Sequence, residues 1–378
     1  MSKPNENKTR PINRLILVGN GFDLAHGMKT SYSDFILWYF SKCWEDAKRT
    51  HTMNYEFPNE NIFSNELLTF TYDRNSVHYT NPFDKLELKD FSDIKALINP
   101  TPNSSSRKLV NLTFNSDFFK SVVGDFCNKN WVDIENLYYE FLKKRLNDHY
   151  LHIDHKISNL QPVLKKLNDH FHILKSELEE YLNSLLTSSN NQTTEDYIYE
   201  KPIAHVFERD CHFQLGDVMM LNFNYTATTE MYKGPDSDVI HIHGELNKKE
   251  NPIIFGYGDE RDETYVLLEK ANIPEVFTHI KSFDYFKTDN YSRLLAFLES
   301  EFDVYIMGHS CGLSDRTLLS TIFEHENCRF IKIFYHNNQE NYRKTTYEIS
   351  RHFKDKAEMR KKVLDITKCN PLPQSKSV

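Results

Sequence analysis

The sequence has few cysteines, and no two of them stand close together. Its 378 residues include only six, without a single Cys-x-x-Cys pair. This spacing disfavours a zinc ribbon and a disulfide scaffold, and it makes reduced thiols in the cytosol the simpler interpretation. We therefore expect a cytoplasmic protein without a bound metal. The six are Cys43, Cys127, Cys211, Cys311, Cys328 and Cys369.

Long apolar runs and an excess of positive charge are also missing. No window approaches 18 apolar residues, and residues 1–8 lack the apolar stretch of a signal peptide, so neither secretion nor membrane insertion is indicated. The net charge of -8 argues against a nucleic-acid-binding surface spread over the whole molecule. A local basic patch stays compatible with that charge.

The apolar content is sufficient for a sizeable buried core. Hydrophobic residues make up 39% of the chain and aromatic residues 13%. The length allows two domains, or one α/β core with a large insertion.

The strongest local pattern lies near the start of the chain. Residues 15–18 are four consecutive aliphatic residues that lead into Gly19, Asn20 and Gly21, and an amphipathic segment follows at 32–44. The order is buried strand, glycine turn, helix, which is typical of nucleotide-binding proteins. Alone it is a weak signal, because Leu24 stands where the third glycine of G-x-G-x-x-G would be.

The remaining pattern predicts a discontinuous α/β core. It covers 10–49 and 205–354, and we expect a three-layer, Rossmann-like parallel sheet. Residues 355–378 are expected to form a C-terminal helix and a flexible tail. Further strands are expected at 218–221, 239–244, 252–255, 303–307 and 329–335, and helices at 291–300 and 315–324.

A large, mainly helical insertion is expected at 50–204. Residues 50–106 are rich in Asn, Asp, Ser and Pro, which indicates long loops with short helices. Apolar residues then recur at helical spacing over 131–150 and 157–186. This spacing predicts two long helices that form an antiparallel pair.

Four of the expected strands end in polar residues or glycine. In an open parallel sheet the ligand site lies at the carboxyl ends of the strands, so these ends should converge. The four motifs are Gly19-Asn20-Gly21-Phe22-Asp23, Asn222-Phe223-Asn224-Tyr225-Thr226, His241-Ile242-His243-Gly244 and Gly308-His309-Ser310-Cys311-Gly312-Leu313-Ser314-Asp315.

In order and chemistry these motifs resemble the AbiH family of bacteriophage abortive-infection proteins, whose pattern they match nearly residue for residue. Residues 131–135 in the insertion also resemble a family signature. That family in turn looks like a distant branch of the sirtuin-like NAD-binding folds. The resemblance implies a sirtuin-like core and an anti-phage role, with a phage-derived trigger as a candidate partner and a homo-oligomer as a further candidate state.

Carried over by position, the resemblance implies a site for NAD or a related dinucleotide. Asn224 would hold the ribose or a water, and His243 would be the catalytic base. Sirtuin deacylases have a four-cysteine zinc module that this chain lacks, so hydrolysis of NAD with release of nicotinamide is the more economical reaction. The residues expected to bind the dinucleotide are Gly19, Asn20, Gly21, Asp23, His26, Tyr225, Gly308, Ser310 and Asp315.

The residue types agree with this chemistry. Glycosidic cleavage passes through an oxocarbenium-like state, so the protein mainly positions the ribose and removes a proton. An amide suits the first task, and a histidine with a pKa near its usual value of about 6.5 suits the second. Structural roles are the alternatives: a hydrogen-bonded strand end for His243, a turn or cap for Asn224, a cap for Asp23 and packing for His26.

Two other functions stay open. The same pocket would bind a nucleotide without cleaving it in a sensor or partner module. Residues 308–312 also fit the G-x-S-x-G pattern of a hydrolase with Ser310 as nucleophile. Only His325, His336 and His352 follow as candidate bases, which leaves little room for the later strands of that fold.

The spaced His149, His152 and His155 suggest a metal cluster at first. They stand where a long helix should end, in a context rich in Lys and Asp. Steps of three residues drift around a helix, so we expect a solvated or capping face there.

Overall fold

A computed structural model describes residues 11–53, 61–72, 88, 90–98, 110–129, 133–151, 160–189, 215–235 and 237–375. Contacts within the chain divide it into two compact units, and we describe each by itself. The core unit comprises Met1–Thr30, Asn183–Glu269 and His279–Val378, and the insertion unit comprises Ser31–Leu182 and Lys270–Thr278. Among the described residues, no helix combines the length and the apolar character needed to cross a membrane.

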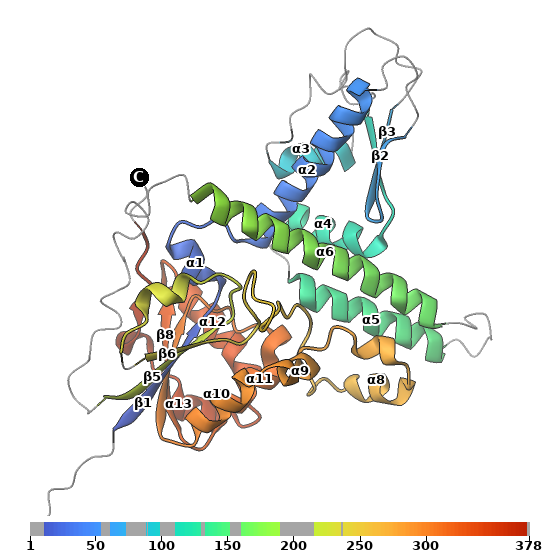
Figure 1. Ribbon diagram of the computed structural model, residues 1–378. Coiled ribbons are helices and arrows are strands. Elements are labelled where there is room, and N and C mark those ends of the chain that lie inside the picture. The colour runs from blue at the N-terminus through green and yellow to red at the C-terminus, as the bar shows by residue number, and fades with distance from the viewer. Residues whose placement is uncertain are drawn as a thin grey trace, which may run out of the picture. The chain divides into compact units, whose positions relative to one another are not determined.

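The core unit is built on a six-stranded sheet in the order β6-β5-β1-β7-β8-β9 (Figure 1). All five strand pairings are parallel. Numbered by their place within the sheet, the strands follow the order 3-2-1-4-5-6, which is that of a Rossmann-like fold and confirms the predicted fold class. The strands are β1 (Ile12–Val18), β5 (Leu215–Asn222), β6 (Ser237–His241), β7 (Phe302–Met307), β8 (Cys328–Tyr335) and β9 (Asn370–Pro371).

The apolar run of β1 makes it a central strand. All seven of its residues are buried, as expected for a parallel strand that is covered on both faces. Successive side chains point to opposite faces: Leu15 and Leu17 pack in one apolar cluster, and Ile16 and Val18 in another.

Helices cover both faces of the sheet. The first cluster includes residues of α10 (Asn290–Leu298), α11 (Arg316–Phe323) and α12 (Gln339–Ser350), and the second includes α1 (Asn20–Ala25). The other helical segments of this unit include α8 (Tyr265–Ala271, which continues into the insertion unit), α9 (Lys281–Asp284), α13 (Lys356–Lys362) and the 3-10 turns η3 (Thr228–Tyr232), η5 (Tyr285–Lys287), η6 (Leu313–Asp315) and η7 (Ile366–Lys368).

Two predictions for the core are wrong. Residues 252–255 form no strand. Pro252 has no N–H to donate to a ladder, and the buried residues 253–255 are held instead by a bond of 2.7 Å from the Ile254 amide to the His243 carbonyl. The tail after Cys369 is ordered as far as the structure describes it. It adds β9 beside β8 and buries Leu372, because a short edge strand needs only a few ladder bonds.

The insertion unit contains both helices and a small sheet. The predicted helical pair is confirmed: Tyr138 of α5 packs on Phe171 of α6 with ring centroids 4.2 Å apart, and its hydroxyl donates to Asn168 at 2.6 Å. Helix α5 begins after Asp133, whose carboxylate accepts the Asn136 amide at 2.9 Å. The helices are α2 (Tyr32–Met53), α3 (Phe91–Ile98), α4 (Asp117–Lys129), α5 (Ile134–Leu151), α6 (Leu160–Ser189) and the 3-10 turn η4 (Pro274–Phe277).

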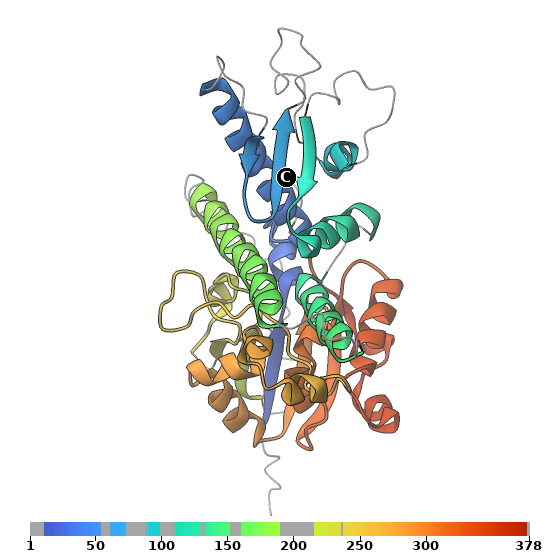
Figure 2. The same ribbon diagram turned by 90° about the vertical axis from the view of Figure 1, so that its right-hand side faces the viewer.

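Three short antiparallel strands form a separate sheet in this unit (Figure 2). They are β2 (Asn61–Ser64), β3 (Leu68–Tyr72) and β4 (Val110–Phe114). The prediction of loops and short helices over 50–106 is therefore wrong for 61–72. Helix α2 packs in this unit too, since Trp44 lies edge-on against Phe70 and Tyr39 against Phe119; the predicted boundary at 49 had placed its first part with the core.

Candidate functional site

The four motifs of the sequence lie at the carboxyl ends of four neighbouring strands. Those strands are β6, β5, β1 and β7, in that order across the sheet. The direction in which the chain adds strands reverses between β1 and β7. Ligands of open α/β sheets bind outside the strand ends at this switch point.

The glycines of the β1 and β7 loops let these loops pack directly on each other. The Gly21 amide donates to the Gly308 carbonyl at 2.8 Å. A Cβ on Gly21 would lie 2.8 Å from the Gly308 Cα, and one on Gly308, where φ is +71°, would lie 2.2 Å from the Phe22 nitrogen. A Cβ on Gly19 would lie 2.5 Å from the His309 Cα. The space beside these glycines is filled by backbone of the neighbouring loop.

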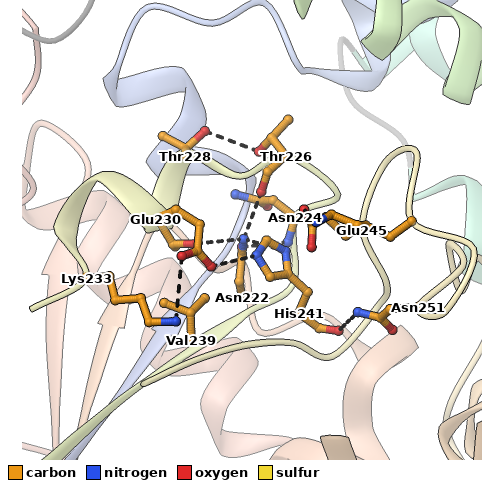
Figure 3. Close-up of polar contacts among 12 residues, drawn as sticks. Asn222, Asn224, Thr226, Thr228, Glu230, Lys233, Val239, His241, Glu245 and Asn251 are labelled. Carbon is orange, nitrogen blue, oxygen red and sulfur yellow. Dashed lines mark hydrogen bonds and ion pairs between the residues drawn. The ribbon is translucent and has the colours of Figure 1, made fainter. Parts of the chain in front are cut away.

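An asparagine network, formed by Asp23, Asn222, Asn224, Thr226 and His241, ties the β5 and β6 ends to the β1 loop. Figure 3 labels four of its members, Asn222, Asn224, Thr226 and His241. The Asn224 side-chain amide donates to the Gly19 carbonyl at 3.0 Å, and its backbone amide donates to Asn222 Oδ1 at 2.9 Å. Asn222 Nδ2 donates to the Thr226 carbonyl at 3.0 Å and lies 3.2 Å from His241 Nδ1. These contacts are the ones expected of a turn residue, the alternative role that the position of Asn224 in the sequence also predicted.

Asp23 is the titratable group of greatest interest in this network. Its side chain is 1% exposed, and Oδ2 accepts the Thr226 hydroxyl at 2.6 Å. The other oxygen, Oδ1, is buried and has no hydrogen-bond partner among the described residues. Burial raises the pKa of this carboxyl to about 6, although polar groups of Thr226, Thr228 and Asn224 act in the opposite direction.

A charge cluster of His243, Lys281, His309 and Asp315 lies at the β6 and β7 ends. Lys281, which is fully buried, places Nζ 2.7 Å from Asp315 Oδ1. The two histidines bring Nε2 to 3.2 Å and 3.6 Å of the same carboxylate. Burial opposes the ionised form of Asp315, but Lys281 and His243 outweigh it and hold the pKa of Asp315 well below its usual range.

His243 is held firmly within this cluster. Its Nε2 lies 3.3 Å from the Tyr285 hydroxyl as well as beside Asp315, and the ring also hydrogen-bonds the backbone of Phe223. Burial and then Lys281 lower the pKa of His243, against the effect of Asp315. Asn224 and His243, the predicted catalytic pair, therefore belong to different networks, and no hydrogen bond joins them in the described part of the chain.

The other predicted polar residues are half-buried or exposed. His26 bonds the Phe22 carbonyl at 2.7 Å and also the Tyr232 hydroxyl, which is a packing role. The Tyr225 hydroxyl donates to the Ile254 carbonyl at 3.2 Å. Asn20 and Ser310 are exposed.

The geometry around Ser310 does not favour a serine nucleophile. Ser310 makes no hydrogen bond with another described residue, so it has no base. The nearby His309 accepts the Cys311 amide at 3.0 Å through Nδ1, and His352 Nε2 lies 2.8 Å from the Cys311 carbonyl. Gly308 and Cys311, with φ of 71° and 55°, are the left-handed residues of this loop, and Ser310 is not one of them.

The described residues show no candidate metal site. They hold no group of three or more His, Cys, Asp or Glu side chains arranged around an ion. Of the three spaced histidines, His149 is half-buried near the end of α5, while His152 and His155 lie outside the described residues.

Sequence reasoning missed Lys281, Tyr285 and the role of His241. Lys281 is one of 46 basic residues and follows no motif, so nothing in the sequence marks it as buried. His241 stands in the same motif as His243. Strand β6 ends at His241, and it is this histidine that contacts Asn222 in the asparagine network. The sequence alone does not show where the strand ends.

The family model described as "Bacteriophage abortive infection AbiH" matches residues 15–337. The chain belongs to the AbiH family. The matched range contains all four strand-end motifs and the insertion, so this AbiH chain carries its family pattern on the edge of the sheet described above. The family description assigns it to phage abortive infection and names no catalytic activity. A search of curated proteins returned no match.

Proposed function

We propose that this AbiH chain hydrolyses NAD during abortive infection and releases nicotinamide, with water as the acceptor. The supporting observation is the position of the four polar motifs, at the carboxyl ends of β6, β5, β1 and β7 in a sheet of Rossmann order. Dinucleotides bind at this edge in such sheets. Asn20 and Ser310, one in each of the two loops at the switch point, are polar side chains exposed to solvent.

The reaction requires little covalent help from the protein. The nicotinamide–ribose bond breaks, nicotinamide leaves as a neutral molecule with the bonding electron pair, and water adds to the oxocarbenium-like carbon and loses a proton. The protein has to position the ribose and accept that proton. Asn224 supplies a positioned amide at the end of β5, fixed through Gly19.

Two residues compete for the role of proton acceptor. His243 has a lowered pKa and is neutral at pH 7, but Asp315, Tyr285 and the Phe223 backbone already surround its ring. Asp23 has one oxygen without a hydrogen-bond partner in the described part of the chain, and its pKa of about 6 means that it is ionised at neutral pH. We assign the role to Asp23 and keep His243 as the rival assignment.

Nicotinamide release tests the proposal. Purified protein incubated with NAD should release free nicotinamide, and Asn224→Ala should lower turnover at least ~100-fold, the scale of lost positioning and acid–base help. Asp23→Asn should cause a similar loss, and His243→Gln a smaller one. Asp289→Asn, at an exposed aspartate of the same unit, is the matched control and should leave turnover unchanged.

The alternative outcomes are distinct. A large loss in His243→Gln with Asp23→Asn fully active would move the base to His243. Calorimetric NAD binding without any nicotinamide release, also in extract from phage-infected cells, would favour the second candidate, a nucleotide-binding sensor. The hydrogen bond from the Asn224 side chain to the Gly19 carbonyl supports that candidate, because this amide is then already used within the fold.

A further inference from the structure

A cavity lies within the insertion unit, among α4, α5 and α6. Its volume is about 340 Å³, which falls within the range of small-molecule sites. None of the described residues that line this cavity belongs to the four strand-end motifs. The lining residues used below are Asp117, Phe118, Phe141, Arg145, Lys166 and His170.

Nitrogen donors without partners gather at this cavity. Arg145 on α5 and Lys166 on α6 make no ion pair with any described residue. His170, one helical turn after Lys166, is 5% exposed, and its Nε2 has no hydrogen-bond partner among the described residues. A guanidinium, an ammonium and a buried imidazole around one space form a donor set suited to a phosphate group.

The cavity lining also contains two aromatic side chains and a carboxylate. The rings of Phe118 and Phe141 meet edge to face with centroids 5.6 Å apart, and they supply an apolar wall for a planar group. Asp117 is the single carboxylate among the described residues that line the cavity. It would repel a phosphate but accept a hydrogen bond from a hydroxyl or amino group at the other end of a ligand.

We propose that this cavity binds a small phosphorylated ligand of mononucleotide size. The phosphate lies between Arg145, Lys166 and His170, the planar base lies against the phenylalanine pair, and Asp117 accepts from a polar group of the nucleoside. A mononucleotide matches the cavity in size and in this division between charged and aromatic lining. The ligand site is separate from the strand-end motifs and does not depend on NAD hydrolysis.

Calorimetry on the full chain with AMP as the probe tests the site. AMP should bind, adenosine should bind at least 10-fold more weakly, and inorganic phosphate should compete with AMP. Arg145→Gln and Lys166→Gln should each raise the Kd for AMP about 10-fold or more, as expected for loss of a charge-assisted contact. Lys144→Gln and Lys165→Gln remove the same charge from exposed neighbours outside the lining and should change the Kd less than two-fold.

Three results would overturn the proposal. The first is the absence of AMP binding at millimolar concentration. The second is an equal loss of affinity in all four variants, which would show only general attraction by positive charge. The third is AMP binding that none of the four variants weakens, which would place the nucleotide elsewhere on the chain.

Discussion

Asp23 shows how a single residue can carry both a cost in stability and a chemical use. Its carboxyl is almost fully buried in α1, just after the central strand β1, and one of its oxygens has no partner among the residues that the structure describes. Burying a carboxylate without full hydrogen bonding is unfavourable, which is why its pKa rises. Native proteins tend to retain such groups where function needs them.

Replacing Asp23 by asparagine should therefore stabilise the folded protein at neutral pH. The folded pKa of about 6 lies above the ordinary 3.8, so the carboxyl contributes stability below about pH 4 and loses it as pH rises through 6. Asp23→Asn removes that loss, worth up to about 3 kcal/mol at pH 7.5. Urea unfolding at pH 7.5 and pH 4.5 measures it, with Asp289→Asn as control.

The stabilisation in Asp23→Asn should shrink to about 1 kcal/mol at pH 4.5, because the folded carboxyl is then neutral while the unfolded one, with its ordinary pKa of 3.8, is still mostly ionised. An Asp23→Asn protein that is less stable than the parent at pH 7.5 would contradict the assignment. That result would mean that the ionised carboxylate is well satisfied in the folded state.

The sequence identified residues at this edge but not their contacts. The four motifs named Asn224, His243, Asp315 and Asp23 correctly as neighbours of strand ends. Whether Asn224 faces a ligand or the Gly19 carbonyl depends on the packing of two loops 205 residues apart in the chain. Lys281 shows the same limit, since its partner Asp315 is known only from the fold.

At the scale of elements, the loops after β1 and β7 act as one packed unit. Gly308 has a left-handed backbone that only glycine adopts freely, and its missing Cβ makes room for the Phe22 nitrogen. These glycines therefore hold the ends of two central strands together. A ligand at this edge would rest on a preformed floor of backbone.

Gly308→Ala should destabilise the core unit by roughly 2–4 kcal/mol, because the new methyl group meets backbone and φ is unfavourable. Gly234→Ala is the matched control in the same unit, since its Cβ would meet only Ser237 Oγ at 3.8 Å. That variant should change stability by less than about 0.5 kcal/mol. Thermal unfolding of both variants against the parent provides the comparison, and equal midpoints would show that the two loops are not tightly packed.

Long, strongly patterned elements were predictable, and short ones were not. The buried run of β1 and the apolar spacing of α6 each extend over several turns or ladder bonds, so their local signal is strong. Strands β2 and β3 have four and five residues, too few for a period to show against a polar background. Strand β9 has two residues and forms only because β8 offers an open edge.

The whole molecule combines a nucleotide-type sheet with an insertion that has its own core and its own cavity. Every residue used in the proposed reaction belongs to the core unit, and every residue of the proposed phosphate site belongs to the insertion unit. Variants can therefore be chosen in one unit that leave the proposed site residues of the other unchanged. This separation allows the cellular role to be assigned to one site or to both.

Protection of bacteria against phage gives the decisive test at this scale. In cells that express the chain, infection should lower both phage yield and NAD, because loss of the cofactor halts the host before phage assembly ends. Asn224→Ala, if folded, should restore phage yield and NAD together, and Asp289→Asn should behave as the parent. Plaque counts and the NAD concentration, measured in the same infected culture, distinguish NAD hydrolysis from a nucleotide-binding sensor. Protection that persists in Asn224→Ala cells with NAD at its uninfected level would mean that the AbiH chain defends without consuming the cofactor.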